Sequence, residues 1–327
     1  MSRIAVFGAG AIGCWLGGRL AAGGAEVTLI GRARVIDELR DGLRVSELGG
    51  AGFTVTPQLS TDVAAAADAD VVLVTVKSAA TAEAARELAG TRGVVISMQN
   101  GVRNADVLRG LLPDRRVLAG MVPFNVVKLA PDRYHRASAG TLMIDNAEGA
   151  AALQHACSAS GLELSLRDDM PAVQWSKLLM NLNNAINALS GIPLAQELSG
   201  RDYRRCLAAA QSEALGVLAA AKISIAKLTL LSVPWIARLL LLPDALFKRA
   251  AGRIVAIDPQ ARSSMWDDLQ AGRTTEIDYI QGEVVTIAER LGRTVPVNRG
   301  LVRLIRAAET GGRRDFTALE LRRELGV

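Results

Sequence analysis

The stretch "AVFGAGAIGCWLG" at residues 5–17 decides the fold of the N-terminal half of this chain. It contains the spacing Gly8-x-Gly10-x-x-Gly13, after a short apolar run and before a helical pattern. In a dinucleotide-binding fingerprint Gly8 permits the tight turn, Gly10 lets the backbone approach a pyrophosphate, and Gly13 lets helix and strand pack closely. A tight turn without a ligand is the alternative, but the strand–loop–helix context favours the fingerprint.

The same loop and its surroundings predict which cofactor binds. A diphosphate would lie on the N–H groups at the helix start, around Ala11 and Ile12. An NAD site places an acidic residue at the end of the second strand, on the ribose 2′-hydroxyl. This chain has Arg32 there, with Lys77 at the end of a later strand on the same sheet edge. Arginine favours a 2′-phosphate, so we predict NADP(H); the alternative is that both cations are ordinary loop residues.

Apolar runs typical of buried parallel strands alternate with helical patterns through the first half of the chain. They occur at residues 3–10, 25–32, 68–78 and 93–101, with later strands of hairpin character at 116–129 and 140–147. Such runs, separated by helices, indicate a parallel sheet covered on both faces. From about residue 168 the strand signals stop. We therefore predict an α/β, doubly wound Rossmann-type domain at 1–168 and an all-α domain at 169–327.

Composition narrows the class of protein and its partners. The 38 Lys and Arg against 33 Asp and Glu are spread along the chain, which favours a solvated surface over nucleic-acid binding. Three cysteines without C-x-x-C spacing argue against a disulfide framework and a metal site, and fit a reducing, cytoplasmic compartment. The segment 228–242 is apolar but short, and Pro234 and Arg238 interrupt it. We predict a buried or capping helix there and no membrane partner.

A second polar pattern lies in "QWSKLLMNLNNAIN" at residues 174–187. Helical spacing places Lys177, Asn181 and Asn184 within an arc of about 60°, with Asn187 at its margin. A solvent-exposed stripe is the alternative, but surface helices favour Glu, Lys and Arg over Asn. Amides beside one lysine suit a water-poor cleft, because they supply donors and acceptors without burying more charge.

Lysine rather than histidine is the expected proton donor. When a hydride reduces a ketone, the Lys177 ammonium can stabilise the developing oxyanion and donate the proton that it needs. The histidines, His135 and His155, lie outside any recognisable polar pattern. A histidine-dependent dehydrogenase is therefore disfavoured.

Together with the glycine loop, three segments make the chain resemble the ketopantoate reductase (2-dehydropantoate 2-reductase) family. They are "MQNG" at 98–101, "WSKLLMN" at 175–181 and "SSMWDDLQAGRTTEIDYIQG" at 263–282. The resemblance runs over nearly the whole chain. It implies a Rossmann domain, a helical domain and an active site in the cleft between them. It also implies reduction of 2-dehydropantoate to (R)-pantoate with NADPH, a step in pantothenate synthesis.

The resemblance further implies a role for each matching residue. Lys177 would be the general acid, and Asn100 would lie near the nicotinamide and the substrate carbonyl. Asn181 would bind the substrate hydroxyl, Glu276 would help to orient it, and Ser264 would bind the substrate carboxylate. The glycines of the loop and the two cations named above fall where the family binds NADP(H). Glu276 also reads as an exposed helix-start carboxylate, and Ser264 as a helix cap.

The chain departs from the family pattern on what we expect to be the substrate side. Ala185 stands where the family often has Asn, so either Asn184 takes over that substrate contact or the contact is lost. Ala261 replaces an Asn of some members, and residues 120–127 differ as well. Three functions stay open: ketopantoate reduction, which we favour, reduction of another branched 2-oxo acid or an imine, and a non-catalytic NADP(H)-binding regulator. A homodimer is compatible with the apolar segments of the helical half.

Overall fold

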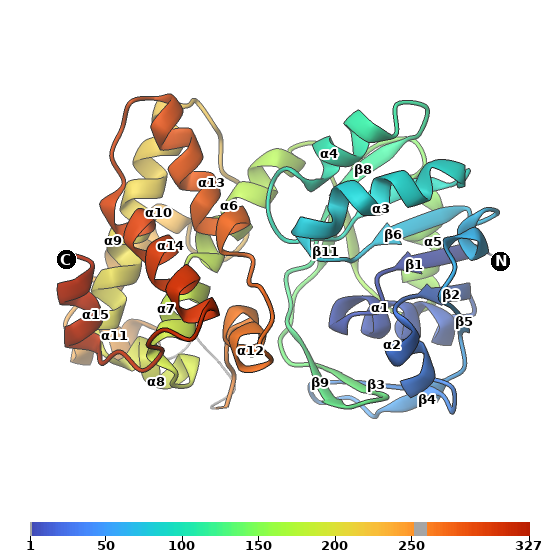
Figure 1. Ribbon diagram of the computed structural model, residues 1–327, viewed down its shortest axis with the longest axis horizontal. Coiled ribbons are helices and arrows are strands. Elements are labelled where there is room, and N and C mark those ends of the chain that lie inside the picture. Colours follow the sequence, from blue (N-terminus) through green and yellow to red (C-terminus); the bar gives the residue numbers. More distant parts are fainter. Residues whose placement is uncertain (1, 252–259) are drawn as a thin grey trace. The chain divides into compact units, whose positions relative to one another are not determined.

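The computed structural model describes residues 2–251 and 260–327 (Figure 1). The chain forms two compact units, Met1–Met170 and Pro171–Val327. The first unit combines a mostly parallel sheet with helices, and the second is helical, which confirms the predicted fold class. Each unit is described by itself below.

The large sheet of the first unit explains the apolar runs of the sequence. Among the described residues it has eight strands, in the order β12-β11-β8-β7-β6-β1-β2-β5. From β5 to β8 every neighbouring pair is parallel, while β11 runs antiparallel to β8. This is the strand order of a doubly wound nucleotide-binding sheet with an antiparallel extension. The strands are β1 Arg3–Phe7, β2 Glu26–Ile30, β5 Gln58–Ser60, β6 Val71–Val74, β7 Val94–Ser97, β8 Val117–Met121, β11 Leu142–Asp145 and β12 Leu164–Arg167.

A second, four-stranded sheet in this unit was not predicted. Its order is β4-β3-β10-β9, from β3 Leu43–Glu47, β4 Phe53–Val55, β9 Val126–Ala130 and β10 Arg133–Arg136. The run at 116–129 is therefore divided: β8 extends the large sheet, whereas β9 forms a hairpin with β10 in the small one. β4 has only three residues and β9 has no buried one, so neither shows the alternation of buried and exposed residues that reveals a strand.

Helix α1, Ala11–Ala22, packs against both sheets. A β-carbon on Gly17 would lie 2.6 Å from Leu29 of the large sheet, and one on Gly18 2.7 Å from Val45 of the small sheet. The two glycines thus let the helix approach a sheet on either side. Trp15 Nε1 also donates a 2.9 Å hydrogen bond to the Ser46 carbonyl oxygen of the small sheet.

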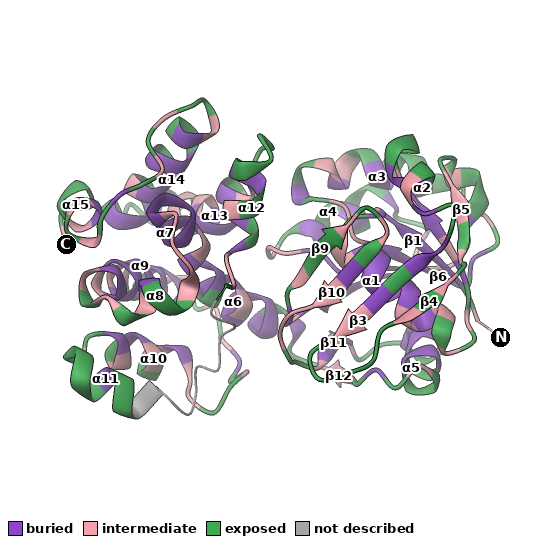
Figure 2. Cartoon of the chain, turned by 90° about the horizontal axis from the view of Figure 1, so that it is seen from below, coloured by how far each residue is buried: buried purple, intermediate pink, exposed green. Residues whose placement is uncertain are grey.

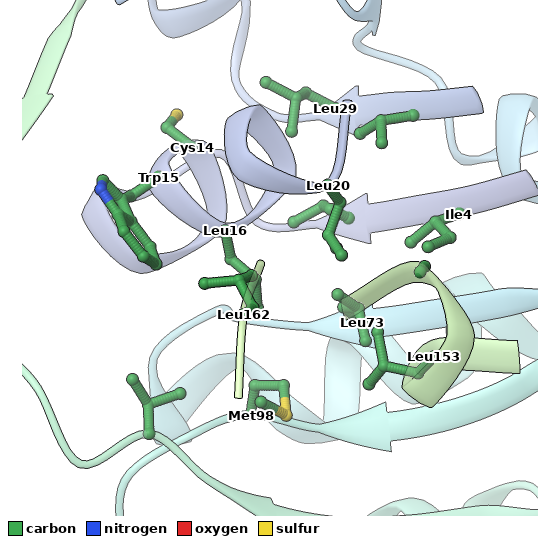
Figure 3. Close-up of a cluster of buried hydrophobic side chains, with 14 of the residues drawn as sticks. Ile4, Cys14, Trp15, Leu16, Leu20, Leu29, Leu73, Met98, Leu153 and Leu162 are labelled. Carbon is green, nitrogen blue, oxygen red and sulfur yellow. The ribbon is translucent and has the colours of Figure 1, made fainter. Parts of the chain in front are cut away.

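The core of the unit forms around this helix. Figure 3 shows Leu16 and Leu20 of α1 near Leu73 of β6 and Leu153 of α5, all fully buried. The other helical elements of the unit are α2 Ala33–Glu38, α3 Thr81–Glu87, α4 Asn104–Leu111, α5 Ala150–Ala159, η1 Val63–Ala66, η2 Ser78–Ala80 and η3 Leu88–Gly90.

The second unit is built from helices. They are α6 Met170–Asn181, α7 Asn183–Ser190, α8 Leu194–Ser199, α9 Arg201–Ala220, α10 Val233–Leu240, α11 Asp244–Ala251, α12 Ser264–Gln270, α13 Ile277–Arg290, α14 Pro296–Glu309 and α15 Ala318–Glu324. The single helix expected over the asparagine-rich stretch is divided at Leu182, whose carbonyl oxygen accepts a 2.8 Å hydrogen bond from Gln281 Nε2. Figure 2 shows α7 as mostly buried and α11 as mostly exposed.

The apolar segment 228–242 contains the helix α10, which packs on α9 through one face, as expected for a capping helix and not for one buried all round. Only one face of α10 is buried, through Val233, Ala237 and Leu240. Trp235 on the same helix is 59% exposed. Among the described residues, no helix is both long and apolar enough to cross a membrane.

Candidate functional site

Four loops of the first unit converge at one edge of the large sheet. The glycine loop follows β1, and the segments that begin with Gly31, Thr75 and Met98 follow β2, β6 and β7. These four strands are adjacent and parallel, with Phe7 in register with Ile30 and Val74. Since carboxyl ends of parallel strands meet at one edge, the predicted cofactor residues are gathered there.

The glycine loop has the geometry of a phosphate-binding turn. Gly8 has a φ of +118°, and a β-carbon there would lie 2.7 Å from the Val76 nitrogen. A β-carbon on Gly13 would collide with the Gly8 carbonyl oxygen. Gly10 is different: its backbone is extended, and a β-carbon there would meet nothing within 4 Å. The chain itself needs glycine at 8 and 13, whereas the space beside Gly10 is open to a ligand.

The first turn of α1 supplies the donors for such a ligand. Ala11, Ile12 and Gly13 open the helix, so their N–H groups have no carbonyl partner within it. The N–H of Cys14 is the first to bond back, to the Gly10 oxygen at 2.9 Å. These donors and the helix dipole suit the diphosphate of a dinucleotide.

Arg32 lies at the end of β2, at the N-terminus of α2. It is exposed, and it makes no ion pair with any residue that the structure describes. Its neighbour Arg34 is paired with Glu38 at 3.4 Å. No acidic residue stands between Ile30 and Asp37, so Arg32 is the charged group best placed for an anionic part of a ligand.

Lys77 and Asn100 follow β6 and β7, and a buried polar network joins their loops. Ser78 Oγ donates to the Asn100 carbonyl oxygen at 3.1 Å. The amide of Gln99 donates to the Val76 carbonyl oxygen at 3.0 Å and to Thr81 Oγ1 at 2.8 Å. Lys77 is exposed and Asn100 half-buried, so the network fixes the backbone and leaves these two side chains at the sheet edge.

In the second unit, Lys177 and Asn181 lie one turn apart on α6, and Asn184 follows on α7. Lys177 and Asn184 are half-buried, and Asn181 is buried. None of the three is exposed, unlike the residues of an ordinary surface stripe. Burial lowers the pKa of Lys177 to about 8. An amine that titrates near neutral pH can give up a proton readily, as a general acid must.

Two predicted substrate residues lie at helix starts in this unit. Ser264 is the exposed first residue of α12, but the cap is Ser263, whose Oγ accepts from the Trp266 N–H at 3.2 Å. The capping reading of Ser264 is therefore wrong by one residue. Glu276 precedes α13 and is half-buried, not exposed. Thr275 Oγ1 accepts from the Ile277 N–H, so the Glu276 carboxylate does not cap the helix.

The structure adds a buried polar group that the sequence patterns missed. Asn187 is fully buried and donates to Glu197 Oε2 at 2.7 Å, while its Oδ1 accepts from the Ser263 N–H at 2.8 Å. Burial raises the pKa of Glu197 to about 8, against hydrogen bonds from Asn187 and Asn183 that lower it. The position of Asn187 at the margin of the polar arc was the one available signal.

The departures from the family pattern also have places in the structure. Ala185 is fully buried in α7, and the Ala261 carbonyl oxygen accepts from the Leu194 N–H at 2.9 Å. Within 120–127, Phe124 is buried against Trp15 of α1, with ring centroids 5.0 Å apart. Part of that departure therefore lies in the core of the first unit.

Other chemistries find little support in the described part of the chain. Cys14, Cys157 and Cys206 are free and buried, and burial raises the pKa of each to about 12. No three His, Cys, Asp or Glu side chains come together as metal ligands among the described residues. His135 bonds Ser46 in the small sheet, and His155 is exposed on α5.

The doubly wound sheet with this glycine loop defines the first unit as a dinucleotide-binding domain of the Rossmann class, and a helical unit follows it. Residues 4–149 match the family described as "Ketopantoate reductase PanE/ApbA", and residues 169–309 match its C-terminal domain. The chain belongs to the ketopantoate reductase family.

Individual relatives agree with this placement. The 2-dehydropantoate 2-reductase of Halobacterium salinarum is 32% identical, over 95% of this chain and 100% of that protein. The enzyme of the same name from Archaeoglobus fulgidus is 26% identical, over 95% and 99%. A crystal structure of a PanE/ApbA family ketopantoate reductase from Ralstonia eutropha superimposes with a TM-score of 0.82 at 30% identity, covering 94% of this chain and 99% of that one.

Proposed function

We propose that this protein reduces 2-dehydropantoate to (R)-pantoate with NADPH, in pantothenate synthesis, with Lys177 as the general acid. The observation that carries the proposal is the half-buried Lys177, with a pKa lowered to about 8, one helical turn from buried Asn181 in a member of the ketopantoate reductase family. Relatives named 2-dehydropantoate 2-reductase support the substrate.

The cofactor would be held by the first unit and would supply the hydride. The N–H groups of Ala11, Ile12 and Gly13 would bind its diphosphate, and the open space at Gly10 would admit it. Arg32 would pair with a 2′-phosphate, with Lys77 adding charge at the same edge. This assignment favours NADPH over NADH.

The substrate side of the reaction is assigned to the amine and amides. Lys177 would donate a proton to the carbonyl oxygen as the carbonyl carbon gains a hydride, so that the ketone, one hydride and one proton give an alcohol. Asn181 would bind the substrate hydroxyl, with Asn184 supplying the contact that Ala185 lacks. Ser264 would bind the carboxylate. Two further residues, Glu276 for the hydroxyl and Asn100 for the carbonyl, complete the proposed set.

The direct test is oxidation of NADPH, followed at 340 nm, with 2-dehydropantoate and a panel of other 2-oxo acids, and NADH run in parallel. The proposal expects 2-dehydropantoate to have the highest kcat/KM, with NADPH preferred. A kcat/KM for 2-dehydropantoate below a tenth of the best acid would reject the substrate. Tight NADPH binding without reduction of any acid would indicate a regulator.

A second candidate is reduction of another 2-oxo acid on the same scaffold. D-mandelate dehydrogenase, crystallised with NADH and anilino(oxo)acetate, has the same fold, with a TM-score of 0.79 at 21% identity. Ala185 is the feature of this chain that favours the alternative, because it removes an amide from the proposed substrate side. The panel above separates the two candidates.

A homodimer and a cytoplasmic location complete the proposal. The fold is shared with a dimeric ketopantoate reductase from Staphylococcus aureus, with a TM-score of 0.70 at 15% identity. Exposed apolar side chains, among them Trp235 and Leu246, offer a surface that a second copy could cover. Light scattering after size exclusion would give the mass: about 69 kDa is twice the 34.5 kDa of one chain.

A further inference from the structure

The segment that leads into α12 is tied to the end of α7 and the turn after it. The Leu194 N–H donates to the Ala261 carbonyl oxygen at 2.9 Å, and the Arg262 guanidinium donates to the Gly191 carbonyl oxygen. Ser263 Oγ, 3% exposed as a residue, donates to the Asn184 carbonyl oxygen at 3.1 Å. The start of α12 is therefore docked on α7, next to a proposed substrate residue.

Asn187 is the side chain at the centre of this contact. Its Oδ1 accepts from the Ser263 N–H at 2.8 Å, and its Nδ2 donates to Glu197 Oε2 at 2.7 Å and to the Ile192 carbonyl oxygen at 3.0 Å. Both Asn187 and Glu197 are fully buried. Three hydrogen bonds on one amide leave its side chain a single orientation, in which the oxygen faces α12.

Glu197 supports this orientation from the amino side of the Asn187 amide. If the Asn187 amide were flipped, its oxygen would face the Glu197 carboxyl and its NH2 group would face the Ser263 N–H. Two hydrogen-bond donors would then point at each other, and neither would have an acceptor there. Asn187 lies on α7, Glu197 lies on α8, and Ser263 is the cap of α12. The hydrogen bonds of Asn187 therefore join three helices.

Resting on the proposed function, we propose that Asn187, oriented by Glu197, is a positioning residue that fixes where α12 presents Ser264 to the substrate carboxylate. Ser264 follows the clamped Ser263 directly, so a shift of the clamp moves it. The pair touches no proposed substrate group with its own side chains. Its effect is therefore expected on substrate affinity and not on the chemical step.

Three variants test the proposal. Asn187→Ala removes the clamp, and we expect the KM for the 2-oxo acid to rise by about tenfold or more, with kcat and the KM for NADPH within about twofold. Glu197→Ala removes the acceptor of Asn187 Nδ2 and is also expected to raise the KM for the 2-oxo acid. Glu197→Gln keeps an oxygen for Asn187 Nδ2, so its KM for the 2-oxo acid is expected to equal that of the wild type. A difference between Glu197→Ala and Glu197→Gln would show that the hydrogen bond matters.

Asn298→Ala is the matched control. Asn298 is also fully buried in this unit and donates to Ala210 and Glu213, but it has no contact with Ser263. Its KM values should equal those of the wild type. An unchanged substrate KM in Asn187→Ala, or an equal rise in Asn298→Ala, would overturn the proposal.

Amide hydrogen exchange gives a readout that needs no turnover. Peptides covering residues 261–266 should exchange faster in Asn187→Ala, because the Ser263 N–H loses its acceptor, and at the wild-type rate in Asn298→Ala. Unchanged exchange in Asn187→Ala would overturn the clamp itself. If the wild-type chain reduced no 2-oxo acid, the proposed function and the substrate role of the clamp would fail together, and faster exchange would still identify the contact.

Discussion

The carbonyl oxygen of Gly8 occupies the space in which a β-carbon on Gly13 would lie. This contact closes the turn between β1 and α1, and Thr75 Oγ1, 2.6 Å from the same position, leaves no room for relaxation. Gly10, between them, has open space instead. The three glycines of the motif therefore have different roles: Gly8 and Gly13 are required by packing within the turn, whereas Gly10 leaves space for a ligand.

Gly10→Ala and Gly13→Ala should separate these constraints. We expect Gly10→Ala to keep the wild-type melting temperature and to raise the KM for NADPH, because a methyl group enters the space proposed for the diphosphate. Gly13→Ala should lower the free energy of unfolding by about 1–3 kcal/mol, as overpacking does. Thermal melts and NADPH titrations measure both effects; an unchanged NADPH affinity in Gly10→Ala would move the cofactor elsewhere.

Lys177→Ala should lower kcat by at least ~10²-fold, since a positioned general acid contributes that much. In the wild type, the rate of reduction should fall as pH rises through about 8, where Lys177 loses its proton. The pH profiles of kcat for the wild type and Lys177→Arg check this assignment. Arginine stays charged throughout, so the fall near pH 8 should vanish in that variant, together with most of the activity.

Arg32→Gln should lower kcat/KM for NADPH by about tenfold and leave that for NADH unchanged, because only NADPH carries a 2′-phosphate. Arg34→Gln is the matched control, since Arg34 is two residues away and already paired with Glu38. Steady-state kinetics with both cofactors measure the preference. Equal losses for NADPH and NADH in Arg32→Gln would contradict the assignment.

Glu197→Gln should make stability less dependent on pH. The folded pKa of about 8 lies above the ordinary 4.5, so between these values unfolding releases a proton. As pH rises from about 4.5 to about 8, the free energy of unfolding of the wild type should therefore fall by up to about 1.4 kcal/mol per pH unit relative to that of the variant. Tyr203 and Cys206, the titratable neighbours, have pKa values of about 12 and stay neutral. Urea unfolding at pH 5, 6.5 and 8 gives the slopes.

Arg204→Met should lower the free energy of unfolding by about 3 kcal/mol, since each buried carbonyl oxygen left without its donor costs about 1–3 kcal/mol. Arg204 is fully buried, and its guanidinium donates to the carbonyl oxygen of Leu240, the last residue of α10, to that of Leu242, and to Asp244 at 2.8 Å. Arg205 is the adjacent cation, and its side chain is 41% exposed, so Arg205→Met should cost less than about 1 kcal/mol. Denaturant midpoints compare the two.

The large sheet was predictable because its strands are buried on both faces and appear as uninterrupted apolar runs. The small sheet was not, because β10 carries Arg133, His135 and Arg136 in four residues and is held by pairing with β3, almost ninety residues earlier. The break at Leu182 was equally hidden, since Gln281, which binds its carbonyl oxygen, lies far along the chain.

The candidate site divides in the same way. Lys177 and Asn181 lie one turn apart on α6, a relationship that local periodicity can reveal, whereas Asn184 lies on the next helix, α7. Asn187 looked marginal on that face, and its role depends on Glu197 and Ser263, whose meeting is a matter of tertiary packing. The capping serine was misplaced by one position because two serines stand side by side at the start of α12.

The close fit of α1 between two sheets has a consequence for the thermodynamics of cofactor capture. Gly17 and Gly18 let the helix pack against Leu29 and Val45, so the N–H groups of its first turn have a fixed orientation before a ligand binds. A preorganised receptor forfeits little conformational entropy on association. Calorimetry should therefore report a heat-capacity change that reflects only the surface covered by the nucleotide, without the larger signature of coupled folding.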